Sequence, residues 1–204
     1  FWMYPTGQRD FNRRDPAFFA YSSTDLKTWN VHGPVLKFSD VKWIYDDGVR
    51  PHYAWAPAVI EHDGRYYFYF SVGLQGVTPS RIGVAVGDSP SGPFRDSGKP
   101  LLTGYVGYEA IDPMVFRDPR SGRTFFYAGG SAGRKLRVFE IAANLLVFKQ
   151  EIPVETPPHY TEAPFVHFYN GLYYLSYSGG EWNKESYCVH YATSKTPVGP
   201  WRYR

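Results

Sequence analysis

The 204-residue sequence predicts an all-β fold of short four-stranded sheets that repeat along the chain, as in a β-propeller. The first supporting observation is composition. Aromatic residues make up 19% of the chain, which argues against a disordered protein. The 20 glycines and 17 prolines recur throughout it. This argues against a helical bundle, because a proline inside a helix costs about 3 kcal/mol. The second observation is an internal repeat of about fifty residues.

Each copy of the repeat contains an apolar segment that follows a proline, a turn dipeptide and an aromatic segment. The turn dipeptides are Asp63-Gly64, Ser121-Gly122 and Asn170-Gly171. Proline is tolerated at the first residue of a strand, and these dipeptides accept the positive φ of a tight hairpin turn. Each copy therefore predicts two antiparallel strands. The prolines of the three copies lie 56 and 51 residues apart, at Pro57, Pro113 and Pro164.

A third strand, followed by a serine-containing turn and a closing aromatic residue, recurs at residues 18–29, 82–94 and 189–201. Sheets with exposed apolar faces have to stack on their neighbours, which favours a propeller. A β-sandwich is the alternative, but its strands do not usually repeat a turn signature at a constant period. Residues 134–152, the longest stretch without glycine or proline, allow a short helical turn at 142–145 and a strand at 136–139.

The sequence holds about three and a half such modules, whereas propellers usually have about four to eight blades. The first module has a second strand at residues 1–6 and a third strand but no opening strand, and the fourth module ends just after Trp201. An unclosed propeller exposes sheet edges, which invites aggregation. We therefore expect residues 1–204 to be one β-propeller domain without the opening strand of its first blade and without its last blade. The apolar start at Phe1 does not resemble a signal peptide, and we expect the sequence to be an excerpt of a longer chain.

The charge balance is mild, with a formal net charge of +3 and scattered basic residues. This excludes the basic stripe of a nucleic-acid-binding surface, and no apolar run approaches the roughly 20 residues of a membrane-spanning helix. We expect a neutral partner, with no nucleic acid and no membrane. The single Cys188 can form no internal disulfide, and we expect it to be buried.

Trp55, Asp112 and Glu162 head the three visible opening strands. These strands line the channel of a propeller, so their heads should converge at one mouth. Asp112 and Glu162 then form a candidate pair of catalytic carboxylates, and like charges in a narrow channel predict that one of them stays protonated. The alternatives are that Asp112 caps a turn, that Glu162 is a solvated rim residue and that Trp55 belongs to the core.

Three motifs, in this order, resemble those of the family 43 glycoside hydrolases: Trp55-Ala56-Pro57-Ala58-Val59, Ile111-Asp112-Pro113-Met114-Val115-Phe116 and Thr161-Glu162-Ala163-Pro164-Phe165. Segments 23–29 and 89–94 match linking motifs of that family. The resemblance implies a five-bladed propeller that hydrolyses β-xylosidic or α-L-arabinofuranosidic bonds with inversion. It implies Glu162 as the general acid and Asp112 as the carboxylate that positions this acid and keeps it protonated. It also implies Trp55 as an aromatic wall for a sugar ring.

The resemblance further implies a carbohydrate substrate such as arabinoxylan, arabinan or xylo-oligosaccharides, and no required cofactor. A structural calcium ion fits the complete propeller, since the family often places a channel histidine with calcium in the fifth blade, which this sequence lacks. The family's general base is an aspartate that opens the first blade, upstream of residue 1 here, so we expect residues 1–204 alone to be inactive. We expect no substitute for it in Asp15, which precedes a third strand, or in Asp46 and Asp47, which lie on a polar loop before Trp55.

The remaining candidates are less specific. Tyr108 and Tyr160 flank the carboxylate motifs and are candidates for substrate contact, with packing at the rim as the alternative; Tyr105 and Glu109 lie beside them. Residues 181–183 could shape the leaving-group side. Four histidines show no metal-ligand spacing, and we expect no metal site there: His52, His62, His159 and His167.

Three other propeller hypotheses remain. A non-catalytic carbohydrate-binding propeller would use the carboxylates only to hydrogen-bond sugar hydroxyls. A sialidase-type propeller is disfavoured, because segment 23–29 is a single imperfect Asp-box. A kelch-type interaction propeller has no reason to carry acids at equivalent strand heads.

Overall fold

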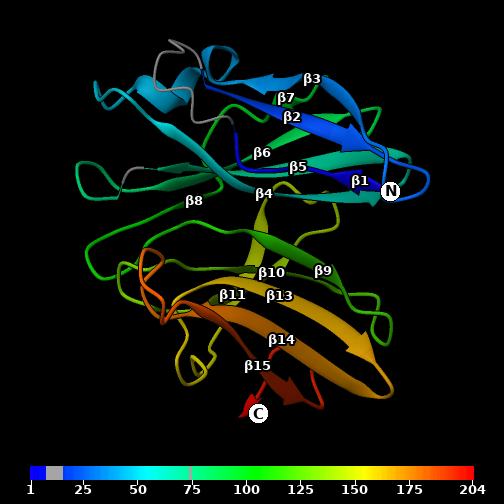
Figure 1. Cartoon of the computed structure of the whole chain (residues 1–204), viewed down its shortest axis with the longest axis vertical. Helices are drawn as coiled ribbons and strands as arrows, with labels where there is room; N and C mark the ends of the chain where they lie inside the picture. Colours follow the sequence, from blue (N-terminus) through cyan, green and yellow to red (C-terminus); the bar gives the residue numbers. More distant parts are fainter. Residues whose placement is uncertain (8–15, 74) are drawn as a thin grey trace. The chain divides into compact units, whose positions relative to one another are not determined.

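The computed structural model describes residues 1–7, 16–73 and 75–204, which form four antiparallel sheets (Figure 1). The chain divides into two compact units, Phe1–Thr103 and Gly104–Arg204, and each unit contains two of the sheets. Strand order within each sheet follows the order along the chain, apart from the short β8. The predicted all-β fold of successive meanders is therefore confirmed.

The first unit holds a three-stranded sheet of β1 (Trp2–Met3), β2 (Ala17–Ser22) and β3 (Asn30–Lys37). Its second sheet contains β4 (Tyr53–His62), β5 (Arg65–Gly73), β6 (Arg81–Gly87) and β7 (Arg95–Asp96), with β8 (Leu102–Thr103) paired to β6. Two 3₁₀ helices that the sequence analysis did not predict, η1 (Phe38–Asp40) and η2 (Lys42–Tyr45), lie between β3 and β4.

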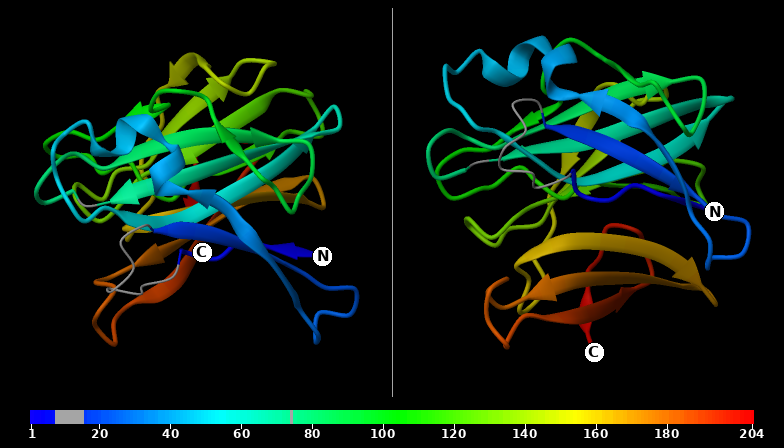
Figure 2. Two further views of the ribbon diagram at one scale, coloured as in Figure 1. Left: turned by 90° about the horizontal axis from the view of Figure 1, so that it is seen from above. Right: turned by 45° about the horizontal axis from the view of Figure 1, so that its top comes forward.

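The second unit holds two four-stranded sheets. One contains β9 (Met114–Arg117), β10 (Thr124–Ala128), β11 (Arg137–Ile141) and β12 (Phe148–Ile152). The other contains β13 (Glu162–Tyr169), β14 (Leu172–Gly179), β15 (Cys188–Ser194) and β16 (Arg202–Tyr203). Figure 2 shows β13, β14 and β15 side by side, in yellow to dark orange.

Two of the three predicted tight hairpin turns are confirmed, whereas Ser121-Gly122 lies within a longer connection between β9 and β10. Asp63-Gly64 connects β4 to β5 with φ of 51° and 74°, and Asn170-Gly171 connects β13 to β14 with φ of 47° and 79°. Asparagine, aspartate and glycine tolerate this left-handed geometry best, which explains their place in the repeat. The helical turn expected at 142–145 is wrong: these residues form a turn between β11 and β12, in which the Leu145 amide donates to the Ala142 carbonyl.

Each unit has an aromatic core of its own. In the first unit the ring of Phe18 contacts those of Phe68 and Phe70, at centroid distances of 5.2 and 6.1 Å. In the second unit Tyr160 contacts Tyr177 at 5.5 Å within a buried cluster. Burial of one such side chain stabilises a fold by about 1.5–3 kcal/mol, so these clusters hold the sheets of each unit in place.

Cys188 is exposed, so the expectation that it would be buried is wrong. It begins β15 directly after an exposed loop, and its Sγ lies 3.3 Å from Nε2 of His190. Within residues 1–7, 16–73 and 75–204, no helix is long and apolar enough to cross a membrane.

Candidate active site

The two acidic residues predicted to share a site both belong to the second unit. Asp112 lies two residues before β9, and Glu162 is the first residue of β13. β9 and β13 contact each other, and each is the opening edge strand of its sheet. The amide of Ala163 donates a 3.0 Å hydrogen bond to Oδ2 of Asp112. The structure therefore brings the two acids together, through the residue that follows Glu162.

The backbone bends sharply where these acids lie. Asp112 and Ala163 have φ of 55° and 57°, and each precedes a proline. Residues before proline normally adopt extended conformations, and left-handed backbone costs about 1–2 kcal/mol for a residue other than glycine. In β13 the pairing register also shifts between Glu162 and Phe165. Such strain persists only where the surrounding structure enforces it, and here it directs Asp112 at the neighbouring strand.

The repeat aligns Glu162 with Trp55 rather than with Asp112. Both Trp55 and Glu162 pair with a serine of the next strand, Ser71 and Ser178, and both precede an Ala-Pro pair. Asp112 instead occupies the left-handed position before proline. The expectation that the two acids share one position in the repeat is therefore off by one residue. Asp112 is itself the residue with positive φ before proline, and it reaches across to the next sheet, whereas Glu162 lies one residue before the corresponding Ala163.

The environment of Asp112 favours its protonated form. Protein atoms surround this residue, although part of its surface stays exposed. Burial and the negative charge of Glu162 raise the pKa of Asp112 to about 7, with a smaller contribution from Glu109, while the hydrogen bond from Ala163 lowers it. Asp112 therefore keeps its proton into the neutral pH range.

A tyrosine that the sequence analysis did not single out binds Glu162. The hydroxyl of Tyr187 donates a 2.8 Å hydrogen bond to Oε1 of Glu162. Tyr187 lies at the end of the loop between β14 and β15, and burial together with Glu162 raises the pKa of its hydroxyl to about 12. The hydroxyl therefore keeps its proton and remains a donor. No spacing in the sequence relates these two residues; only the hairpin of β14 and β15 brings them together.

A third carboxylate, that of Glu109, lies near Asp112 and is almost fully buried. Its Oε2 accepts hydrogen bonds from the Ser131 hydroxyl at 3.1 Å and from the Ala132 amide at 2.9 Å. Glu109 is therefore engaged by the loop after β10. Its contribution to the pair is its negative charge, which helps to raise the pKa of Asp112.

Tyr108 and Tyr160, the two candidates for substrate contact, are both buried. The Tyr160 hydroxyl donates to the carbonyl oxygen of Gly129 at 3.0 Å, and its ring belongs to the core of the second unit. The ring of Tyr108 contacts that of Tyr105, which is exposed. The packing alternative suits both buried rings better.

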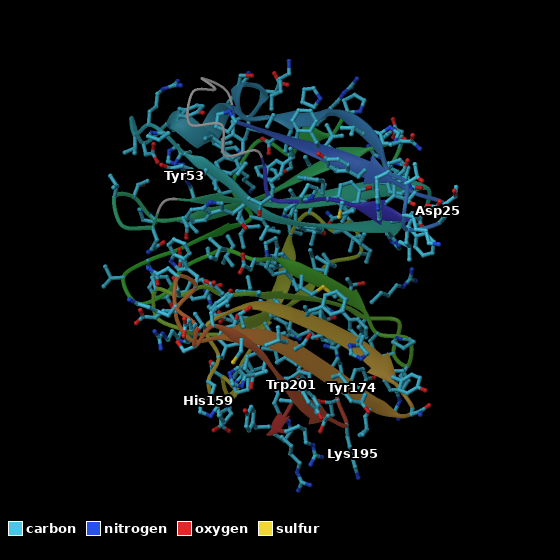
Figure 3. The ribbon with its side chains drawn as sticks, in the orientation of Figure 1. Asp25, Tyr53, His159, Tyr174, Lys195 and Trp201 are labelled. Atoms are coloured by element: carbon cyan, nitrogen blue, oxygen red, sulfur yellow. The ribbon has the colours of Figure 1, made fainter. Side chains whose placement is uncertain are left out.

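Trp55 lies in the first unit, on β4, and is half-buried. Its ring stacks on that of Tyr53, with a centroid distance of 5.8 Å and an angle of 9° between the planes. Tyr53, labelled in Figure 3, is also half-buried. Trp55 and Tyr53 are therefore both partly accessible.

The other acids and the histidines of the sequence analysis have varied surroundings. Asp46 lies on an exposed loop, as expected, but the Asp47 carboxylate forms an ion pair with Arg81 at 2.7 Å. Asp15 lies outside the described residues.

His52 is buried and hydrogen-bonded, whereas His159, labelled in Figure 3, is exposed and stacks on His190. The described part of the chain contains no group of three or more histidine, cysteine, aspartate or glutamate side chains placed to hold a metal ion.

The family model of the glycosyl hydrolases family 43 matches residues 1–204, and the chain belongs to this family. The chain has the five-bladed propeller fold of the family and covers about 70% of it.

Curated relatives carry several specificities in their names. The chain is 36% identical to "Beta-D-galactofuranosidase xynD" of Aspergillus niger, over 98% of this chain and 59% of the relative. It is 30% identical to a "Xylosidase/arabinosidase" of Bacteroides ovatus, over 95% of this chain and 66% of the relative. The chain thus spans about three fifths to two thirds of the length of these relatives.

Solved structures of the family superpose on the whole chain. A β-xylosidase/α-arabinofuranosidase from a compost microbial metagenome, CoXyl43, in complex with xylotriose, matches with a TM-score of 0.79 and 27% identity, over 100% of this chain and 72% of that chain. An α-L-arabinofuranosidase of Clostridium thermocellum matches with a TM-score of 0.76 and 27% identity, over 100% and 67%.

Proposed function

We propose that residues 1–204 belong to the propeller domain of an inverting glycosidase. This enzyme removes terminal xylose or arabinofuranose residues from plant-wall polysaccharides or oligosaccharides. The observation that carries the proposal is the coupling of Asp112 to Glu162, because glycoside hydrolysis needs a carboxylic acid that is still protonated at the working pH. The family membership and the names of the relatives support the same reaction class.

In the proposed mechanism Glu162 donates its proton to the glycosidic oxygen as the bond from that oxygen to the anomeric carbon breaks. A general base upstream of residue 1 takes a proton from water, whose oxygen attacks the opposite face of the anomeric carbon. The two catalytic carboxyl groups of inverting enzymes lie roughly 6.5–9.5 Å apart, which leaves room for this water. Asp112 holds the strand of Glu162 in place by accepting the hydrogen bond from the Ala163 amide. No cofactor takes part.

The sugar is proposed to pack on Trp55. One face of a pentose ring carries C–H groups, and burying this face against an indole stabilises binding without any charged partner. This fits the mild net charge of the chain.

A second substrate is favoured by the relative with 36% identity, which is named a β-D-galactofuranosidase. β-D-Galactofuranose has the same five-membered ring as α-L-arabinofuranose, with the same arrangement of ring hydroxyls, and carries one additional CHOH group outside the ring. A pocket for arabinofuranose that is open at this position would admit both sugars.

The test is a release assay on the longer protein that carries these residues. We compare three 4-nitrophenyl glycosides as substrates: the β-xylopyranoside, the α-L-arabinofuranoside and the β-D-galactofuranoside. NMR of the first-formed sugar identifies its anomer. We expect release of at least one sugar with inversion, and no activity from residues 1–204 alone. If the folded longer protein releases none of the three but binds xylotriose in calorimetry, the non-catalytic carbohydrate-binding propeller replaces the enzyme.

A further inference from the structure

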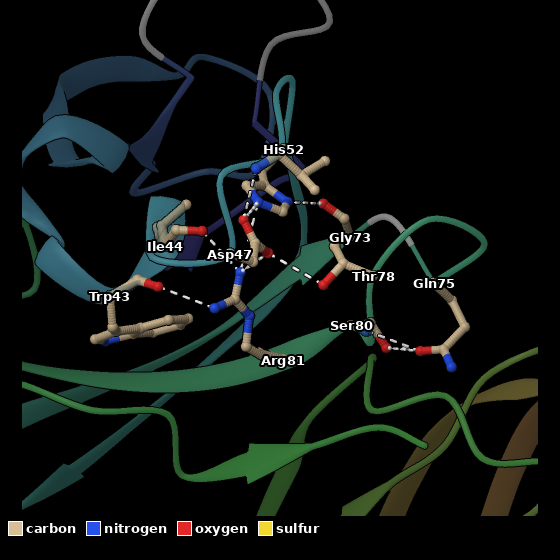
Figure 4. Close-up of polar contacts among 10 residues, drawn as sticks. Trp43, Ile44, Asp47, His52, Gly73, Gln75, Thr78, Ser80 and Arg81 are labelled. Atoms are coloured by element: carbon tan, nitrogen blue, oxygen red, sulfur yellow. Dashed lines mark hydrogen bonds and ion pairs between the residues drawn. The ribbon is translucent and has the colours of Figure 1, made fainter. Parts of the chain in front are cut away.

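A polar network of the first unit connects the 3₁₀ helix η2 to the end of β5 (Figure 4). Its centre is the guanidinium group of Arg81, on β6. This group donates hydrogen bonds to the carbonyl oxygens of Trp43 at 2.9 Å and Ile44 at 2.7 Å, and to Oδ2 of Asp47 at 2.7 Å. An ion pair of low exposure with these additional hydrogen bonds is rigid, because its charge would be costly to leave unpaired.

Asp47 connects the network to β5 through His52. Oδ1 of Asp47 lies 3.1 Å from Nε2 of His52, and Oδ2 also accepts a hydrogen bond from the hydroxyl of Thr78 at 3.1 Å. The other ring nitrogen of His52, Nδ1, lies 3.1 Å from the carbonyl oxygen of Gly73. His52 is only 1% exposed, so this bridge is shielded from water. The network therefore fixes the peptide of Gly73, the last residue of β5.

The indole ring of Trp55 lies directly on Gly73. A Cβ atom on Gly73 would overlap the six-membered part of the indole and lie 2.5 Å from Cε3, closer than real carbon atoms approach. Gly73 does not have a positive φ, so its backbone conformation does not require glycine. Glycine is required here by the contact with the indole ring. Gly73 also pairs with Tyr53 across the sheet, and the ring of Tyr53 stacks on Trp55.

We propose that Gly73, held by the His52–Asp47–Arg81 network, is a positioning residue for Trp55. In this proposal the stacked pair of Tyr53 and Trp55 is a preorganised platform for an uncharged saccharide. Gly73 supports the indole at its edge, and Tyr53 fixes its plane. The inference rests on the sugar-binding role proposed above for Trp55, and it identifies residues that act on binding without touching the reacting atoms. Preorganisation of this kind lowers the entropy lost on binding, so its loss affects affinity first.

Gly73→Ala tests the proposal in the longer protein, with xylotriose as the binding probe and the best sugar of the release assay as substrate. The added methyl group displaces the half-buried indole of Trp55, while the hydrogen bonds of the sheet remain. We expect KM and the dissociation constant for xylotriose to rise about ten-fold, with kcat within about two-fold of wild type. The matched control is Gly76→Ala, because Gly76 is exposed and a Cβ there meets nothing within 4 Å.

A double-mutant cycle with Trp55→Ala separates positioning from general damage. The three atoms nearest to a methyl group on Gly73 all belong to the indole. Without the indole, Gly73→Ala should therefore add no further loss of affinity. If Trp55→Ala itself leaves xylotriose binding unchanged, the sugar-binding role of Trp55 is wrong and the inference falls with it. If Trp55→Ala weakens binding but Gly73→Ala behaves like the Gly76 control, or costs as much without the indole as with it, only the positioning inference is overturned.

Tyr53→Leu provides a second route if Gly73→Ala does not fold. The residue is half-buried, so leucine fits, but the stacked support of the indole is lost. We expect KM to rise several-fold with kcat retained. An unchanged KM would contradict the proposed platform.

Discussion

The starts of β4 and β13 share one backbone geometry but carry different chemistry. In each strand an alanine with positive φ precedes a proline, at Ala56 and Ala163, and the pairing register shifts at that point. In each, the alanine amide donates to a side chain from an earlier segment of the same unit. Ala56 donates to Oγ1 of Thr6 at 3.1 Å, and Ala163 donates to Oδ2 of Asp112 at 3.0 Å.

The difference lies in the groups that this geometry holds. In β4 a neutral hydroxyl is placed beside Trp55, and neither group changes charge with pH. In β13 a carboxyl group is placed beside Glu162, whose negative charge helps burial to raise the pKa of that group. The same backbone geometry thus holds a hydroxyl beside an aromatic residue in β4 and two acids side by side in β13. In the proposed function the first arrangement packs on the sugar and the second provides the acid.

Glu162→Gln removes the proposed proton donor and should have the largest effect. We expect kcat on an unactivated xylo-oligosaccharide to fall about 10²–10⁴-fold, because general acid catalysis contributes this much. Glutamine keeps the shape of the side chain and an oxygen that can accept from Tyr187, so the melting temperature should stay near that of wild type. A 4-nitrophenyl glycoside, whose leaving group needs little protonation, serves as the control and should lose less. Unchanged turnover of both substrates would remove Glu162 from the mechanism.

Asp112→Asn should stabilise the protein at high pH. The folded-state pKa of Asp112, about 7, lies above its ordinary value of 3.8, so the folded protein binds the proton more tightly than the unfolded chain. The stability this provides is complete below pH 4 and is lost as the pH rises through 7. Asparagine cannot ionise but can still accept from Ala163. The melting temperature of the variant should exceed that of wild type by about 4 °C at pH 8 and by much less at pH 4, measured by calorimetry. An equal difference at both pH values would contradict the raised pKa.

The hairpins of both regions follow from the sequence, because a two-residue turn with positive φ needs Asp63-Gly64 or Asn170-Gly171 and little else. The pairing of Asp112 with Glu162 also follows, since the repeat places both at openings of adjacent sheets. The one-residue offset between them is also visible, since Asp112 directly precedes Pro113 whereas Ala163 stands between Glu162 and Pro164. The left-handed backbone that lets Asp112 accept from Ala163 could not be predicted from residue type.

The contacts made by loops could not be predicted. The network of Arg81, Asp47 and His52 joins a 3₁₀ segment to two strands, and the bond from Tyr187 to Glu162 crosses a hairpin. Neither has a spacing that the sequence repeats. Their partners are set by how loops fold back on the sheets, which tertiary packing decides.

Thr6→Val tests the uncharged side of the comparison and should have the smallest effect. Valine keeps the volume of threonine but cannot accept the hydrogen bond from Ala56. We expect a loss of about 0.5–1 kcal/mol in the free energy of unfolding from urea denaturation, equal at pH 4 and pH 8. Thr24→Val, at an exposed position outside this contact, is the control. A loss that grew with pH would show that the site of Thr6 is not electrostatically neutral.

Titration of the Asp112 side-chain carboxyl by ¹³C NMR, in the wild-type protein and in Glu162→Gln, tests the coupling of the two acids most directly. The wild-type residue should titrate with a pKa of about 7. In the variant its pKa should fall, because the neighbouring negative charge is gone, but should stay above 3.8, because burial remains. A wild-type value near 3.8, or the same value in both proteins, would mean that Asp112 and Glu162 do not share a site.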